Sequence, residues 1–210
     1  MGDQPKIKTA DNIAGVVNDS FGFWQPSQVI VHERNIEGDY KALTDYLMRM
    51  EHVGRADEQE VTLHRLYNAI DDVRLSEEGQ KAALQVWHDL RRIRGLTDNA
   101  GVYVQGPEAD NATTDWHFHG DGVERTILCK YNGSATEIAK NKDVTSWGKD
   151  DPNRTFVVCD VKPDAEPVTL DNGHVFSMTG DARFFGKPTV HRKPPPDGEA
   201  SLILISEPYL

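Results

Sequence analysis

The sequence predicts an α+β fold in which a small β-barrel or jelly roll is buttressed by N-terminal helices. Apolar residues recur at helical spacing up to Gly95, and short strand-like segments separated by turn residues follow it. A chain of 210 residues suits a single domain. We therefore expect residues 1–95 to form a mainly helical support layer and residues 96–210 to form the barrel core.

A short strand and three helices are expected in the first half of the chain. The segment SQVIVHE (27–33) predicts the strand, which precedes the helices. Ser76 is a suitable N-cap for the third helix, and Gly95 is placed to end it. The apolar faces of the three helices are, in order, Tyr40, Leu43, Leu47 and Met50; Leu63, Leu66, Tyr67 and Ile70; and Leu84, Trp87 and Leu90.

Strands dominate the second half. Turn residues such as Asn132-Gly133 and Asp171-Asn172-Gly173 separate them. The predicted strands are GVYVQ (101–105), DWHFH (115–119), RTILCKY (125–131), TFVVCDV (155–161), EPVTL (166–170), HVFSMT (174–179), PTVHR (188–192) and SLILIS (201–206). Residues 140–154 form a long, polar segment that we interpret as a surface excursion or a lid over a site.

Composition excludes some classes of function. The chain has 23 Lys and Arg against 34 Asp and Glu, and its net charge of -11 disfavours nucleic-acid binding. The longest apolar runs are too short to cross a bilayer, and the N-terminus lacks the apolar core of a secretion signal. Cys129 and Cys159 lie in apolar strand-like runs, which predicts buried, reduced thiols and a cytoplasmic protein.

The stretch TDWHFHGDGVERTILCKYNG (114–133) contains candidate metal ligands. Side chains alternate across a strand, so His117, His119 and Asp121 would project from one face. His119 and Asp121 can occupy adjacent corners of one metal, and His191, on another predicted strand, is the best candidate for a third ligand. Two histidines and one carboxylate leave three octahedral positions open, which suits Fe(II) that binds a co-substrate and dioxygen together.

Other interpretations of the same residues stay open. The histidines can be ordinary hydrogen-bonded strand residues, with Asp121 accepting amide protons in a turn. His117, His119, Glu124 and His191 also resemble the ligand set of cupins, whose first motif contains His-x-His and then Glu. A cupin-type metalloprotein of this kind would not use 2-oxoglutarate. A third possibility is a non-catalytic barrel that acts as a binding module.

Two stretches of the chain resemble an uncharacterised bacterial family known as a domain of unknown function. The family pattern retains the His-x-Asp pair but no histidine at the position of His117, which favours His119, Asp121 and His191 as ligands. The matching residues are Phe118, His119, Asp121 and Val123; Leu128, Cys129, Tyr131 and Gly133; Thr136 and Glu137; and Val190, His191, Arg192, Pro194 and Pro195.

More broadly, the layout is similar to the iron- and 2-oxoglutarate-dependent oxygenases. This resemblance implies a double-stranded β-helix, Fe(II), 2-oxoglutarate and dioxygen, and hydroxylation or desaturation of a small molecule or side chain, since Asp121 retains the carboxylate ligand. The family's basic residue for 2-oxoglutarate is replaced by Ser201 here, and Arg125 and Lys130 are the favoured substitutes. His117, Tyr103 and Gln105 are candidate substrate-binding residues.

Overall fold

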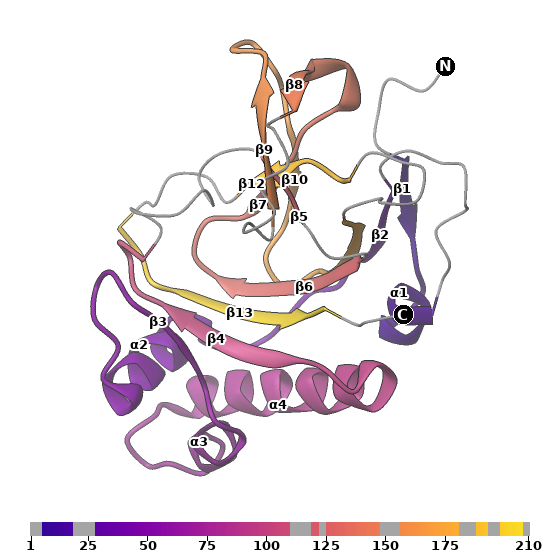
Figure 1. Cartoon of the computed structure of the whole chain (residues 1–210). Coiled ribbons are helices and arrows are strands. Elements are labelled where there is room, and N and C mark those ends of the chain that lie inside the picture. Colours follow the sequence, from indigo (N-terminus) through magenta and orange to yellow (C-terminus); the bar gives the residue numbers. More distant parts are fainter. Residues whose placement is uncertain are drawn as a thin grey trace.

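Two β-sheets lie face to face, and helices cover the outer face of one of them (Figure 1). The computed structural model describes residues 6–18, 28–109, 119–121, 125–147, 156–180, 188–192 and 198–207, and describes residues 6, 28, 119–121, 147 and 156–158 by their backbone. Sheet A has the order β1-β2-β11-β6-β13-β4-β3, and sheet B has the order β10-β7-β12-β5-β9-β8.

The strands of sheet A are β1 (Lys6–Thr9), β2 (Gln28–His32), β3 (Glu58–Glu60), β4 (Gly101–Gln105), β6 (Arg125–Asn132), β11 (Val175–Thr179) and β13 (Ser201–Ser206). Those of sheet B are β5 (His119–Asp121), β7 (Thr136–Ile138), β8 (Val144–Trp147), β9 (Phe156–Val161), β10 (Val168–Leu170) and β12 (His191–Arg192). The helices are α1 (Ile13–Asn18), α2 (Tyr40–Glu51), α3 (Leu63–Ala69) and α4 (Glu77–Thr97).

The mixed α+β architecture confirms the predicted class. Each of the eight predicted strand segments contains residues of an observed strand, although DWHFH shares only His119 with β5 and its other residues lie outside the described part of the chain. From β4 to β7, and again from β10 to β13, consecutive strands belong to opposite sheets. The chain therefore winds back and forth between the two layers.

Three features of the secondary structure were not predicted. The predicted strand at 27–33 is β2, but the first half of the chain also supplies β1 and β3 to sheet A and contains the short helix α1. Strand β7 was missed, since three residues are too few to establish an alternating pattern. The segment 140–154, predicted as a polar excursion or lid, begins with a 3-10 turn (Asn141–Asp143) and strand β8, which pairs with β9.

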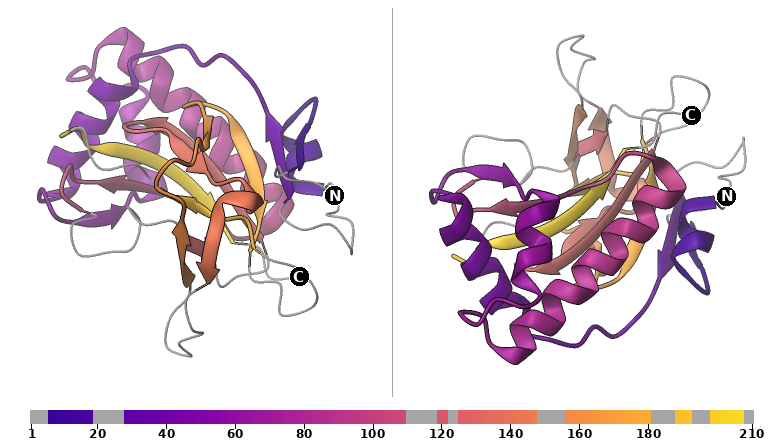
Figure 2. Two further views of the ribbon diagram at one scale, coloured as in Figure 1. Left: turned by 90° about the horizontal axis from the view of Figure 1, so that it is seen from above. Right: turned by 90° about the horizontal axis from the view of Figure 1, so that it is seen from below.

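The helices pack on sheet A through one apolar core. Figure 2 shows α4 lying across the outer face of this sheet, with α2 and α3 beside it. The predicted N-cap is confirmed, since the Ser76 hydroxyl accepts a hydrogen bond from the Gly79 amide at 3.1 Å. The predicted end at Gly95 is wrong, because α4 continues to Thr97. No helix among the described residues is long and apolar enough to span a membrane.

Three predicted core positions of the helices are on the surface instead. Leu63, Tyr67 and Leu84 are 39%, 55% and 41% exposed, respectively. Helix α4 packs through a different stripe, whose small residues let the helix approach the sheet closely. This buried stripe is Gly79, Ala82, Ala83, Val86, Asp89, Leu90 and Ile93.

A buried ion pair links the helices to sheet A. Arg34 donates to both carboxylate oxygens of Asp89, at 2.8 and 2.5 Å, and to the carbonyl oxygen of Gly173 at 2.7 Å. The Tyr131 hydroxyl donates to the same carboxylate at 2.7 Å, and Gln85 donates to it at 3.0 Å. The Asp89 carboxylate is thus satisfied from three directions, and it joins α4, β6 and the segment after β2.

Both cysteines are free and buried, as the sequence predicts. Burial raises the pKa of the Cys129 thiol from 9.0 to about 12, and burial also raises the pKa of Tyr131 well above its ordinary value. In the unfolded chain both groups ionise at lower pH than in the folded chain. Their neutral forms therefore stabilise the fold at neutral pH, and this contribution is lost as the pH rises.

We expect the free energy of unfolding to fall between pH 9 and about 12, by up to ~1.4 kcal/mol per pH unit for each such group. Urea denaturation at a series of pH values measures this slope. Cys129→Ser should make the free energy of unfolding less dependent on pH just above pH 9, because serine does not titrate there. At higher pH the dependence should remain, because Tyr131 still titrates. An unchanged slope in this variant would contradict the assignment.

Candidate metal centre

The pairing of β5 with β12 brings two of the predicted ligands together. His119 and His191 are direct Cα partners in this antiparallel ladder, although 71 residues separate them in the sequence. Side chains of such partners share a face of the sheet, with Cβ atoms typically about 4.5–5.5 Å apart. Strand β9 flanks β5, and β7 flanks β12, so the pair lies in the middle of sheet B.

Asp121 lies on the same strand as His119, two positions further along. It is the last residue of β5, and its Cα partner is Phe156 on β9. Residues two apart on a strand lie on the same face. The structure describes the backbone of His119 and Asp121, whereas His117 and Glu124 lie outside the described residues.

The side chain of His191 faces the space between the sheets. Its other Cα partner is Ile138, which belongs to the apolar cluster that β2, β7, β10 and β11 form between the two layers. His191 is 7% exposed, and its Nδ1 lies 3.1 Å from the carbonyl oxygen of Thr189. A carbonyl only accepts, so Nδ1 is the nitrogen that bears the proton, and in the neutral ring Nε2 holds the lone pair.

Arg192 points to the opposite face of sheet B. Its Nε donates to the Glu137 carboxylate at 2.7 Å, and the two residues are also Cα partners. This agrees with the alternation of side chains along β12, which places Arg192 away from the face of His191.

The two predicted co-substrate-binding cations lie on opposite faces of β6. Arg125 shares the helix-facing side with Ile127 and donates to Ser177 Oγ at 2.6 Å, to the Val17 carbonyl at 2.5 Å and to the Val16 carbonyl. Its guanidinium thus holds the C-terminal end of α1. This contact places Arg125 outside the space between the sheets.

Lys130 faces the space between the sheets and is 3% exposed. The register places it in one row with Ile203 on β13 and Tyr103 on β4. Ser201 and Gln105 form the neighbouring pair on the same face. Two of the predicted substrate-binding residues, Tyr103 and Gln105, therefore lie on the inner face together with Lys130.

Gln105 and Ser201 differ in their hydrogen bonding. Gln105 donates to the Glu58 carboxylate on the edge strand β3 at 2.5 Å. The hydroxyl of Ser201 is buried, and no hydrogen-bond partner for it exists among the described residues. A buried polar atom without a partner is costly, which points to a group that binds there. In the sequence, Ser201 stands out only because a basic residue is expected at that position. No sequence pattern indicates a binding role for its hydroxyl, or that the Thr189 carbonyl accepts a hydrogen bond from His191.

The surrounding polar groups do not themselves form a metal cluster. Among the side chains that the structure describes, no three His, Cys, Asp or Glu residues are grouped closely enough to bind a metal ion. Any metal site in sheet B would therefore include at least one side chain outside this described set.

Comparisons with known proteins give distant structural likenesses. No family model and no curated protein matches the chain. Acireductone dioxygenase from Bacillus anthracis, with a cadmium ion in its active centre, is 12% identical with a TM-score of 0.34, over 87% of this chain and 92% of that chain. A putative oxygenase from Shewanella oneidensis is 12% identical with a TM-score of 0.39, over 97% and 90% of the two chains.

A dioxygenase for auxin oxidation in rice is 9% identical with a TM-score of 0.39, over 96% of this chain and 82% of that chain. Likenesses this weak do not identify a family. The function has to be argued from the residues of the chain itself.

Proposed function

We propose that this protein is a non-haem Fe(II) oxygenase whose metal is bound by His119, Asp121 and His191. One observation supports it above all: the β5–β12 ladder pairs His119 directly with His191, and Asp121 follows on β5. His191, which is distant in sequence, thereby lies beside the backbone of His119 on the strand that also carries Asp121. The two-histidine, one-carboxylate set is the ligand type that Fe(II) oxygenases use.

The strand order supports a double-stranded β-helix as the scaffold. From β4 to β7 and from β10 to β13, consecutive strands alternate between sheets A and B, and the apolar cluster between the sheets contains residues from both layers. Winding of this kind is typical of double-sheet jelly rolls. The proposed metal would lie on the inner face of sheet B, opposite the inner face of sheet A.

The surroundings of His191 fit a metal ligand. A histidine ligand usually donates its second ring N–H to a carbonyl or carboxylate, which fixes the ring and leaves the other nitrogen for the metal. The contact between His191 Nδ1 and the Thr189 carbonyl supplies that donor–acceptor pair. Bound iron would activate dioxygen. His119, Asp121 and His191 would hold the iron and leave three of its coordination positions open.

Lys130 and Ser201 are the proposed anchor for 2-oxoglutarate. Lys130 offers a carboxylate a buried positive charge, and the Ser201 hydroxyl offers a donor that is otherwise unused among the described residues. Ser201 lies two positions from Ile203, the cross-strand partner of Lys130, on the same face of β13, and a β-bulge falls between Leu202 and Ile203. Arg125 is not part of this proposal, because its guanidinium binds α1.

The remaining inner residues would contact the substrate. We assign this role to Tyr103 and Gln105, which lie beside Lys130 and Ser201 on sheet A, and to His117 from the segment before β5. The substrate class is a small molecule or a side chain. Hydroxylation or desaturation is the reaction that the retained Asp121 carboxylate favours.

Lys130→Met should weaken 2-oxoglutarate binding by at least about tenfold, because methionine keeps most of the volume of lysine but removes the charge that faces the carboxylate. The measurement is anaerobic titration of the Fe(II)-loaded protein with 2-oxoglutarate, followed by its weak visible charge-transfer band.

Arg125→Met is the matched control, since it removes a buried cation from the other face of the same strand. It should loosen α1 and leave the titration midpoint unchanged. Equal weakening in both variants would show that the midpoint reports stability rather than an anchor. The absence of any band in the wild-type protein would exclude 2-oxoglutarate while leaving the metal site open.

A further inference from the structure

An apolar and aromatic patch lies on the outer surface of the helical layer. It consists of Leu63 and Tyr67 on α3 and Leu84 and Trp87 on α4, and we call it the α3–α4 patch. Tyr67, Leu84 and Leu63 are among the most exposed large apolar residues that the structure describes, and Trp87 is half-buried. The rings of Tyr67 and Trp87 meet edge to face, with their centroids 5.6 Å apart.

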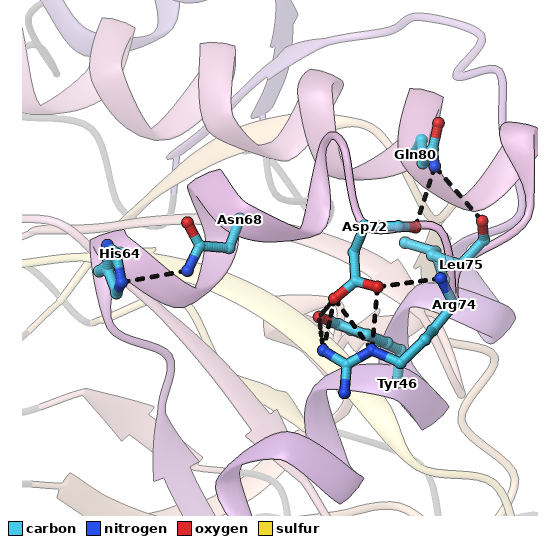
Figure 3. A network of polar contacts seen from close by, with 7 residues as sticks. All are labelled: Tyr46, His64, Asn68, Asp72, Arg74, Leu75 and Gln80. Carbon is cyan, nitrogen blue, oxygen red and sulfur yellow. Dashed lines mark hydrogen bonds and ion pairs between the residues drawn. The ribbon is translucent and has the colours of Figure 1, made fainter.

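A polar network fixes the position of α3 relative to α2 and α4. Figure 3 shows Asp72, in the turn between α3 and α4, accepting hydrogen bonds from Tyr46 on α2 at 2.6 Å and from the Arg74 guanidinium at 2.5 Å. Gln80 on α4 donates to the carbonyl oxygen of Asp72 at 2.9 Å. The two helices therefore present their exposed apolar residues in a fixed arrangement.

The patch is bordered by positive charge, although the chain as a whole is acidic. Across α3 and residues 81–97 of α4 the only acidic residue is Asp89, which is 2% exposed and satisfied by Arg34. The Arg91 guanidinium lies 5.9 Å from the centre of the Trp87 ring. Three other basic residues of these segments are in ion pairs: Arg65 with Glu51, Lys81 with Glu78, and Arg94 with Glu60. The positive border therefore consists of Arg91 and Arg92, which are both exposed.

We propose that the α3–α4 patch is a docking site for an acidic protein segment that inserts aromatic or aliphatic side chains between Tyr67, Leu84 and Trp87. Tyrosine, tryptophan and arginine are the residue types enriched at the energetic centres of protein interfaces, and all three meet here. Carboxylates of the partner would lie against Arg91 and Arg92. This binding function is independent of the reaction proposed for the metal site.

Other occupants fit the charges less well. In a symmetric dimer formed through this patch, the same surface of two copies would meet, so each copy would offer Arg91 and Arg92 a surface with the same basic border instead of carboxylates. Anionic membranes and nucleic acids present extended negative surfaces, which a chain with a net charge of -11 repels overall. The carboxylates of a short acidic segment that inserts into the patch contact the basic border and do not reach the acidic remainder of the surface.

The test is to select a displayed library of random peptides on the purified full-length protein and to measure the binding of enriched peptides by fluorescence anisotropy. We expect enriched peptides to combine Asp or Glu with aromatic or leucine residues. Arg91→Glu and Tyr67→Ser should each weaken their binding by at least about tenfold. Matched controls are Lys41→Glu, an exposed charge reversal on α2, and Val73→Ser, at an apolar residue outside the patch that is 95% exposed.

Several results would overturn the proposal: no enrichment, enriched peptides without acidic residues, or equal binding to Tyr67→Ser and Val73→Ser. Sedimentation velocity would overturn it in favour of a second copy, if the wild-type protein were a dimer that Tyr67→Ser dissociates. Co-sedimentation with phosphatidylserine vesicles would overturn it in favour of a membrane, if binding depended on Arg91. Thermal melts confirm that each exposed-site variant is folded.

Discussion

His191→Ala should weaken Fe(II) binding by at least about a hundredfold. Loss of a hydrogen-bond partner behind a metal ligand already costs about 10–100-fold in affinity, and the ligand itself contributes more. The cross-strand partner of His191, His119, cannot replace it, because His119 is itself a ligand of the same proposed site. Anaerobic equilibrium dialysis with elemental analysis measures the affinity directly.

His174→Ala is the matched control, since it removes a half-buried imidazole from the turn before β11 and should leave the affinity unchanged. Asp121→Ala should also abolish binding if the site is His119, Asp121 and His191. In the cupin-type alternative, Asp121→Ala leaves Fe(II) binding largely intact, and His117→Ala and Glu124→Ala remove it instead. A wild-type protein that binds no metal would leave the binding module as the surviving hypothesis.

Most strands of the second half could be predicted from the sequence, because turn residues bound runs of apolar and β-branched residues. The way the strands pair could not. No local pattern indicates that β12 lies between β5 and β7, since register depends on the packing of whole sheets. The prediction that residues 119 and 191 lie close together therefore depended on assuming a barrel fold. In the structure, the antiparallel pairing of β5 with β12 makes them Cα partners.

The orientations of Arg125 and Lys130 also could not be predicted fully from the sequence. The two residues are five positions apart on one strand, so alternation predicts that they lie on opposite faces. It does not predict which face meets the helices, because β6 is buried on both sides. The contacts of Arg125 with Val16 and Val17 on α1, and of Tyr131 with Asp89 on α4, assign the faces.

The helical periodicity misassigned three exposed residues for a physical reason. Leu63, Tyr67 and Leu84 are apolar and fall at helical spacing, so a count of apolar residues places them in the core. The actual core stripe of α4 is built on Ala82 and Ala83, whose small side chains contribute little to such a count. The apolar residues left outside are the ones that form the α3–α4 patch.

The residues that carry the resemblance to the uncharacterised family have several structural roles. Tyr131 binds Asp89, and the Cys129 thiol lies 3.5 Å from the Arg34 guanidinium, so both belong to the buried network under the helices. Glu137 and Arg192 pair on the outer face of sheet B. A motif read along the sequence thus combines residues that stabilise the fold with residues proposed to bind the metal.

Asp89→Ala should lower the free energy of unfolding by ~3–5 kcal/mol, the typical cost of removing one partner from a buried ion pair. Asp89 accepts hydrogen bonds from Arg34, Tyr131 and Gln85, and its side chain is only 3% exposed. Its removal leaves the guanidinium of Arg34 and the hydroxyl of Tyr131 buried without their acceptor. Urea denaturation monitored by circular dichroism measures the change.

The double variant Arg34→Met, Asp89→Leu separates the two origins of this loss. If the loss in Asp89→Ala reflects an unpaired buried charge, replacing both partners with apolar residues should restore much of the stability, since the desolvation cost of the pair disappears with it. If the loss reflects packing between α4 and β6, the double variant should be no more stable than Asp89→Ala. Arg74→Met, which breaks the exposed pair with Asp72 in the α3–α4 turn, is the control and should cost far less, because solvent screens that pair.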